Sequence, residues 1–214
     1  MNHIQQPLQE LQQIKKMMER SSKFSSISGL SGIAAGICAL AGIWVVVKKI
    51  AGWKLNHVNN VDIPRGERDI ELLLIAIITF TAAAITSFIF IYLRCKKLAI
   101  PVLGMSAKRV ITNFAIPLFA GSLFIIRLAT SGAYELIAPG CLIFYGIALV
   151  NAGKYTLNEV KFLGYGEILL GIANLWMINY GLYFWAGGFG ILHIIYGTIV
   201  WWKYERISSV ENKS

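Results

Sequence analysis

Six long apolar stretches dominate this sequence, and they limit the folds that it can adopt. An α-helix needs about 20 residues to cross the roughly 30 Å hydrocarbon core of a bilayer, and slightly fewer when flanking side chains reach the interface. The strands of a membrane barrel would instead alternate polar and apolar residues over about ten positions. The stretches therefore predict an all-α polytopic membrane protein with six transmembrane helices, at residues 27–47, 72–93, 110–128, 134–150, 162–178 and 181–202.

Composition agrees with a lipid bilayer as the main partner of the chain. Hydrophobic residues make up 56% of the 214 residues and charged residues only 14%, which is outside the range of soluble globular domains. The net charge of +9 does not indicate nucleic-acid binding, because the basic residues lie at the ends of the apolar stretches and not on one face or in one arm.

The distribution of basic residues predicts the orientation in the membrane. Fourteen of the 20 Lys and Arg residues lie on the side of the N-terminus if the six stretches alternate in direction. The positive-inside rule then places both termini in the cytoplasm. The main exception is the loop between the first two stretches, residues 47–69, which carries five basic residues on the opposite side: Lys48, Lys49, Lys54, Arg65 and Arg68.

The N-terminal 25 residues form a separate segment with a helical pattern. Apolar residues recur at spacings of four and three at Ile4, Leu8, Leu11, Ile14 and Met18. We expect an amphipathic helix that either lies on the cytoplasmic leaflet or pairs with a second copy of the chain. The predicted organisation is this leader at 1–25, a transmembrane domain at 26–204 and a cytoplasmic tail at 205–214.

Small residues line three of the predicted spans at helical spacing. The first span carries Gly32 and Gly36 in such a stripe, which allows a second helix to approach closely. The last two spans carry one stripe each, with polar residues among the small ones: Gly164, Glu167, Gly171 and Asn174 in one, and Ala186, Gly190, His193 and Gly197 in the other.

The last two spans are expected to form an antiparallel hairpin about Tyr180, as the third and fourth spans do about "ATSGA". The two stripes would then meet, with Gly171 near Gly190 and Gly164 near Gly197. This register also sets Glu167 opposite His193, which suggests why a carboxylate is tolerated in an apolar span.

The candidate polar site within the membrane consists of Glu167, His193 and Asn174. Ionisable groups inside a bilayer are costly and are commonly functional, so this cluster is a candidate for binding a proton or a small ligand. The alternative is that these residues only join two helices by hydrogen bonds of about 0.6 kcal/mol each.

A second candidate pair flanks the turn between the third and fourth spans. Arg127 and Glu135 lie four residues on either side of this turn, where they could form an ion pair near the outer surface. The alternative is that the Arg127 side chain extends to the lipid headgroups by itself.

Several chemistries find no support in the sequence. The three histidines, His3, His57 and His193, are predicted to lie in different compartments, so no metal site is expected. The "GKYT" and "GGFG" stretches lack the residues and the context of phosphate-binding loops, and no Gly-x-Ser-x-Gly elbow is present. Three cysteines, two of them inside spans, predict no disulfide framework. No cofactor is expected, and nothing supports an enzyme.

Two regions resemble a known group of proteins. They are "SSKFSSISGLSGIAAGICALAG" near the N-terminus and the region from "LIAPGCLIFYGIALVNAGKYTLNEVKFLGYGEILLGIANL" through "FWAGGFGILHIIYGTIVWWKYE". In them the chain resembles a family of uncharacterised multi-span membrane proteins from Bacteroidota. The resemblance implies the inner membrane of a bacterium, and it implies no activity and no site residues.

Two functions remain open at this point. The first is a membrane protein that binds or conducts a small solute or a proton through the bundle, with Glu167 and His193 at its centre. The second is an interaction or sensory subunit that forms a homo-oligomer or contacts a partner through the leader and the first span. A water-lined cavity at Glu167 would favour the first function, and a dry core with exposed small-residue stripes would favour the second.

Overall fold

The computed structural model describes residues 28–58, 65–98 and 103–206, and every regular element in these ranges is helical. The predicted amphipathic leader, residues 1–25, lies outside the described residues. The longer helices are α2 (Gly29–Val58), α3 (Arg65–Lys97), α4 (Met105–Thr130), α5 (Ile137–Ala152) and α6 (Asn158–Trp176). Short helices η1 (Tyr134–Leu136) and η2 (Ile178–Tyr180) precede α5 and the last helical rod.

The last rod is continuous in the chain but changes its winding three times. It consists of α7 (Gly181–Trp185), η3 (Ala186–Leu192), α8 (His193–Trp201) and η4 (Trp202–Arg206). Both η3 and η4 are π-helical, which means that their backbone hydrogen bonds run over five residues. Such wide turns are rare and occur often at functional sites.

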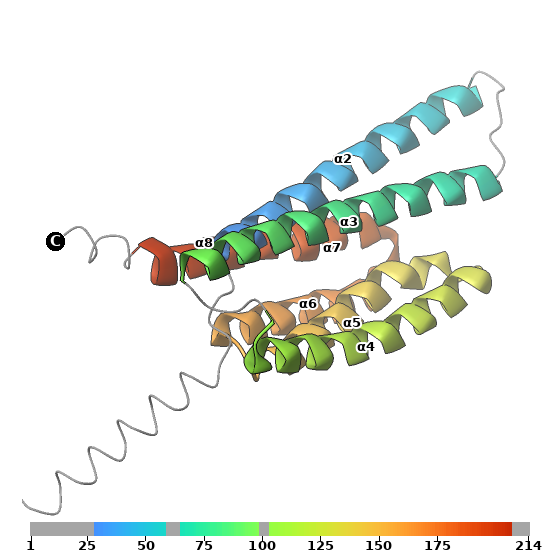
Figure 1. Ribbon diagram of the computed structural model, residues 1–214. Helices are drawn as coiled ribbons and strands as arrows, with labels where there is room; N and C mark the ends of the chain where they lie inside the picture. Colours follow the sequence, from blue (N-terminus) through green and yellow to red (C-terminus); the bar gives the residue numbers. More distant parts are fainter. Residues whose placement is uncertain (1–27, 59–64, 99–102, 207–214) are drawn as a thin grey trace, which may run out of the picture.

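The helices form two groups of three, which Figure 1 shows as two layers. The first helix group consists of α2, α3 and the α7–α8 rod, with α2 packed between the other two. The second helix group consists of α4, α5 and α6, with α5 in the middle. Contacts between the groups run mainly from α5 and α6 to the α7–α8 rod and are less extensive than those within each group.

The prediction of an all-helical chain rich in potential membrane spans is confirmed. Five helices of the described residues are long and apolar enough to cross a membrane: 29–54, 70–97, 105–130, 134–152 and 178–206. The fifth predicted span falls on α6, which is not among them. This helix has 19 residues but includes Asn158, Glu159 and Lys161 in its first turn and Glu167 in its middle, which lowers its hydropathy.

The hairpin of α2 and α3 is longer than the sequence predicted. We expected a loop over 47–69, but α2 continues to Val58 and α3 begins at Arg65. With 30 and 33 residues, these helices are about 45 and 50 Å long. They therefore exceed the roughly 30 Å hydrocarbon core, and Figure 1 shows the hairpin leaning away from α4 and α5 at the end where α2 finishes and α3 begins.

The predicted meeting of the last two small-residue stripes is wrong. A Cβ atom added at Gly164 or at Gly171 would meet α5, at Gly146 O (2.7 Å) and at Ile143 Cγ1 (2.7 Å). These glycines of α6 therefore pack within the second helix group.

The glycines of the last rod and of the first span pack within the first helix group. A Cβ atom at Gly190 would meet Leu40 of α2, and one at Gly197 would meet the backbone of Gly29 and of Ile33. On α2, Gly32 and Gly36 face the α7–α8 rod across the same contact. The stripes are packing surfaces, but each faces a different neighbour from the one that a simple hairpin would give.

Candidate functional site

The candidate site lies where the two helix groups meet. Glu167 comes from α6 and His193 from the first turn of α8, and both are buried, with Glu167 0% exposed. His193 Nδ1 is 3.3 Å from Glu167 Oε1. The chain therefore brings together the acid and the imidazole that the sequence pattern set opposite each other, although the glycines around them face other helices.

The hydrogen bonds of His193 define its ring. Nδ1 is 3.0 Å from the carbonyl oxygen of Gly188, and because a carbonyl can only accept, Nδ1 carries a hydrogen and donates it there. Nε2 is 2.8 Å from the hydroxyl of Tyr145 on α5. In a neutral imidazole Nε2 accepts the Tyr145 hydrogen, and in an imidazolium it donates to the Tyr145 oxygen.

The carboxyl group of Glu167 is enclosed without hydrogen-bond donors. Neither of its oxygens has a hydrogen-bond partner among the described residues, because the Nδ1 hydrogen of His193 points to Gly188. A Cβ atom at Gly188 would overlap Glu167 Oε2, so this glycine leaves the space that the carboxyl occupies. A buried carboxylate without hydrogen bonds is strongly unfavourable, so the imidazole of His193, 3.3 Å away, is the nearest described group that can offset a charge there.

The π-helical turns of η3 shape this site. Gly188 belongs to η3, and His193 is the first residue after it. The carbonyl oxygen of Gly188 accepts a hydrogen bond from the side chain of His193, five residues later. Aromatic side chains surround the ring, with Phe189 centred 6.2 Å and Tyr145 centred 5.5 Å from it. The wide winding thus coincides with the place where the rod carries its polar residue.

Asn174 does not join this cluster. It is fully buried on α6, and its Nδ2 donates to the carbonyl of Met177 at 2.9 Å. It therefore closes the C-terminal end of its own helix. Its Oδ1 has no hydrogen-bond donor in the part of the chain that the structure describes.

Arg127 and Glu135 are both exposed, and no ion pair within 4.0 Å joins them in the described structure. Arg127 Nη1 instead lies 3.4 Å from Thr130 Oγ1 in the same helix. This arrangement corresponds to the alternative in which Arg127 extends alone toward the headgroups.

A polar network closes the end of the bundle at which α2 begins. Glu205 Oε1 accepts from the backbone N–H of Gly29 at 2.6 Å and from Ser28 Oγ at 3.1 Å, and it lies 2.5 Å from Arg94 Nη1. The carboxylate of Glu205 thus accepts a hydrogen bond at the N-terminus of α2, where free backbone N–H groups favour an anion. This contact joins α2, α3 and η4 within the first helix group.

A second ion pair at the same end joins the two helix groups. Glu159 Oε1 of α6 lies 2.5 Å from Lys203 Nζ and accepts from the Tyr204 hydroxyl at 3.1 Å. Burial by itself would raise the pKa of Glu159, but its hydrogen bonds with Lys203, its own backbone and Tyr204 and the nearby positive charge outweigh this and lower it. Glu159 is therefore ionised at neutral pH.

Two residues of the site were not identified from the sequence. Tyr145 belongs to no polar pattern in the sequence, and Gly188 lies in the "GGFG" stretch, which was considered only as a phosphate-binding loop and rejected. A Tyr in mid-span that faces a His in another span leaves no periodic signal of its own. The pairing of spans four and six would have had to be known first.

Comparison with known proteins gives no further assignment. No family model, no curated protein and no solved structure matches the chain. Among the described residues, no group of three or more His, Cys, Asp or Glu residues is arranged to hold a metal ion. The function has to be argued from the site itself.

Proposed function

We propose that the chain is an integral membrane protein that responds to protons, and that Glu167 is the group that binds the proton. The observation that carries this proposal is the fully buried Glu167 carboxyl, whose two oxygens have no hydrogen-bond partner in the described part of the chain and which has an imidazole nitrogen at 3.3 Å. A charge at this position is stable only with a protonated His193, and a neutral acid is stable without it. The proton content of the pair thus determines the attraction between α6 and α8.

The position of the pair gives this proton a mechanical consequence. Glu167 belongs to the second helix group, whereas His193 belongs to the first. Tyr145, from the second group, holds the other ring nitrogen at 2.8 Å. Proton binding or release therefore alters contacts across the junction between the groups, and we propose a shift of α6 relative to the α7–α8 rod as the response.

Infrared difference spectroscopy of the reconstituted protein tests the proposal. We expect a pH-dependent C=O stretching band of a buried carboxylic acid in the wild type and its absence in Glu167→Gln. Glu159→Gln is the matched control, because it removes an acid that is already paired with Lys203, and it should retain the band. A band that persists in Glu167→Gln would rule out Glu167 as the proton site.

Proton conduction is a separate property that liposomes can measure. A pH-sensitive dye inside the vesicles reports flux when a membrane potential is applied. Flux that is lost in Glu167→Gln would identify a conducting bundle, and an infrared band without flux would identify a proton sensor.

The proposed topology has six spans, with α6 as the fifth. α6 packs antiparallel against α5 over its length, and its 19 residues correspond to about 28 Å, which is close to the hydrocarbon thickness. The charge bias and the family resemblance support a bacterial inner membrane with both termini in the cytoplasm. Cysteines placed at Asn59 and Ser209 test this, since only the first should react with an impermeant reagent from outside.

The interaction or sensory subunit remains the alternative function. The glycine face of α2 that suggested self-association is occupied by the α7–α8 rod of the same chain. A second copy would therefore have to bind elsewhere, and this observation favours the proton-binding proposal.

A further inference from the structure

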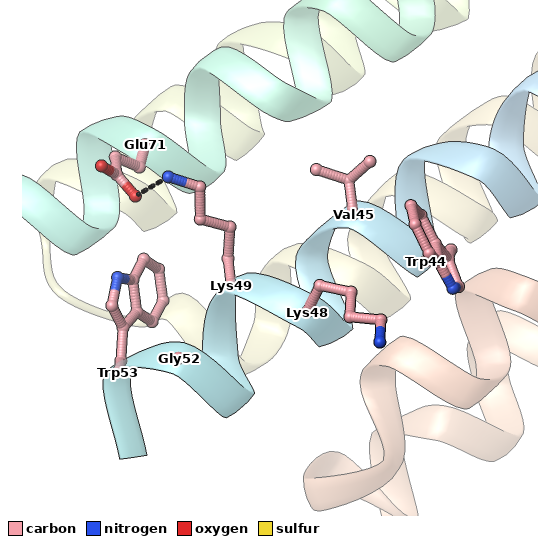
Figure 2. Close-up of a pocket in the computed structure, with 7 residues that line it drawn as sticks. All are labelled: Trp44, Val45, Lys48, Lys49, Gly52, Trp53 and Glu71. Carbon is pink, nitrogen blue, oxygen red and sulfur yellow. Dashed lines mark ion pairs between the residues drawn. The ribbon is translucent and has the colours of Figure 1, made fainter. Parts of the chain in front are cut away.

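A depression opens on the hairpin of α2 and α3, and its lining includes neither Glu167 nor His193. It is lined by residues of α2 and by Glu71 of α3, and Figure 2 shows Lys48 and Lys49 pointing to either side of it. Trp44 and Trp53 flank these lysines along α2. The floor at Gly52 is open, because a Cβ atom there would have no neighbour within 4 Å.

The position of the depression along α2 corresponds to a membrane surface. The Glu205 network at Ser28 and Arg94 defines one polar end of the bundle. Lys48 follows Ser28 by 20 residues, or about 30 Å along a helix, and this is the thickness of a hydrocarbon core. The depression therefore lies at the headgroup level of the leaflet opposite the N-terminus of α2.

The charges in the depression do not cancel. Lys49 Nζ lies 3.2 Å from Glu71 Oε2, so this pair is neutral as a whole. Lys48 has no carboxylate within 4.0 Å among the described residues, and its Nζ lies 5.6 Å from the centre of the Trp44 ring. Among the described lining residues one positive charge thus remains, held by an aromatic face as in cation–π contacts.

An apolar path leads from the bilayer to this charge. Ile37, Ala41, Trp44 and Lys48 recur at spacings of four, three and four, so they share one face of α2. Ile37 is 56% exposed and Trp44 64% exposed. An acyl chain can lie along this face while the attached phosphate reaches Lys48.

We propose that the depression binds the phosphate of an anionic phospholipid in this leaflet. Lys48 supplies the unbalanced charge, and Lys49 is shared between Glu71 and the phosphate. Trp44 packs against the part of the acyl chain that lies nearest the headgroup. A zwitterionic lipid fits less well, because its ammonium group cancels the phosphate charge that Lys48 would otherwise neutralise. The site also accounts for two of the five basic residues that the positive-inside rule does not explain, Lys48 and Lys49, and it does not depend on Glu167.

Native mass spectrometry of the full chain tests the proposal, with chain-matched phosphatidylglycerol and phosphatidylcholine supplied in equal amounts. We expect the wild type to retain phosphatidylglycerol preferentially. Lys48→Gln should lower this preference about fivefold, the effect of one Lys at a membrane surface. Lys97→Gln removes the same charge from the opposite end of α3, outside the depression, and should lower the preference by less.

Replacing the acid in the depression, Glu71, should change the lipid preference in the opposite direction. Glu71→Gln frees Lys49 and should raise the preference for phosphatidylglycerol. Lys48→Gln with an unchanged preference, an equal loss in Lys97→Gln, or a lower preference in Glu71→Gln would each overturn the proposal. So would displacement of the retained lipid by millimolar inorganic phosphate, because free phosphate would then be the ligand.

Discussion

Contacts within the two helix groups differ in kind from the contacts between them. Within the groups, backbones approach each other closely at glycines, as at Gly197 against Gly29 and at Gly164 against Gly146. Between the groups, side chains meet instead, at the Glu167, His193 and Tyr145 cluster and at the Glu159 and Lys203 pair. Polar side-chain contacts tolerate small displacements, whereas close backbone contacts do not.

This difference indicates where the bundle can move. Each helix group should behave as a stiff unit, and the junction between them should be the softer part. The same junction contains the Glu167 carboxyl, for which the described residues supply no hydrogen-bond donor. Substitutions within a group should therefore cost more stability than substitutions across the junction, and four variants test that order.

The largest effect is expected from Gly197→Ala, within the first helix group. The new Cβ atom would lie 2.5 Å from Gly29 O and 2.5 Å from Ile33 N, both of them backbone atoms that cannot rotate away. Overpacking of this kind costs about 3 kcal/mol. Denaturant unfolding in bicelles, followed by circular dichroism, measures this loss.

Gly52→Ala is the matched control for this variant. It introduces the same methyl group on the partner helix, at a position with nothing within 4 Å. It should be neutral or slightly stabilising, because Ala is the better helix former. Equal losses in both variants would mean that the close approach of α2 and the rod does not limit stability.

The next effect is expected from Glu205→Ala, also within the first helix group. The change leaves Arg94, whose side chain is 14% exposed, without this carboxylate and removes the acceptor for the Gly29 N–H. We expect a loss of about 2 kcal/mol. Glu205→Gln keeps an oxygen for Gly29 and should lose less in the same assay.

The sequence predicts the helices better than it predicts which helices pack together. The long apolar runs predict the helices well, because burial in lipid leaves the backbone no other partner. The pairing of helices was predictable only where a short turn joins neighbours, as for α4 and α5. The contact between α2 and the α7–α8 rod joins glycines more than 150 residues apart, and their spacing does not specify a partner.

The candidate site was partly predictable for a related reason. Glu167 and His193 share a depth in adjacent spans, and depth can be counted along the sequence. The wide winding at Gly188 and the approach of Tyr145 from α5 depend on packing between groups, which leaves no local pattern. The sequence did not predict that α2 and α3 continue through most of residues 47–69, because a polar segment outside the apolar stretches is compatible with either a loop or a helix.

Across the junction, Tyr145→Phe should have a smaller effect. It removes the hydroxyl that lies 2.8 Å from His193 Nε2 and preserves the ring that packs on Phe189. One hydrogen bond is worth about 1 kcal/mol, so the loss should be about half of that in Glu205→Ala. Tyr183→Phe, at a side chain that is 75% exposed, should leave stability unchanged.

The smallest effect is expected at the other contact of the junction, the Glu159 and Lys203 pair, and it depends on pH. Because the folded protein lowers the pKa of Glu159, the pair stabilises the fold fully above the unfolded value of about 4.3. This stability is lost as the pH falls through the lower, folded value. Lys203 is 58% exposed, so solvent screens the pair and its contribution should be the smallest of the four. Unfolding of Glu159→Gln and wild type should differ at pH 7 and converge at acid pH, and a gap that widens on acidification would show that the junction is not held by this ion pair.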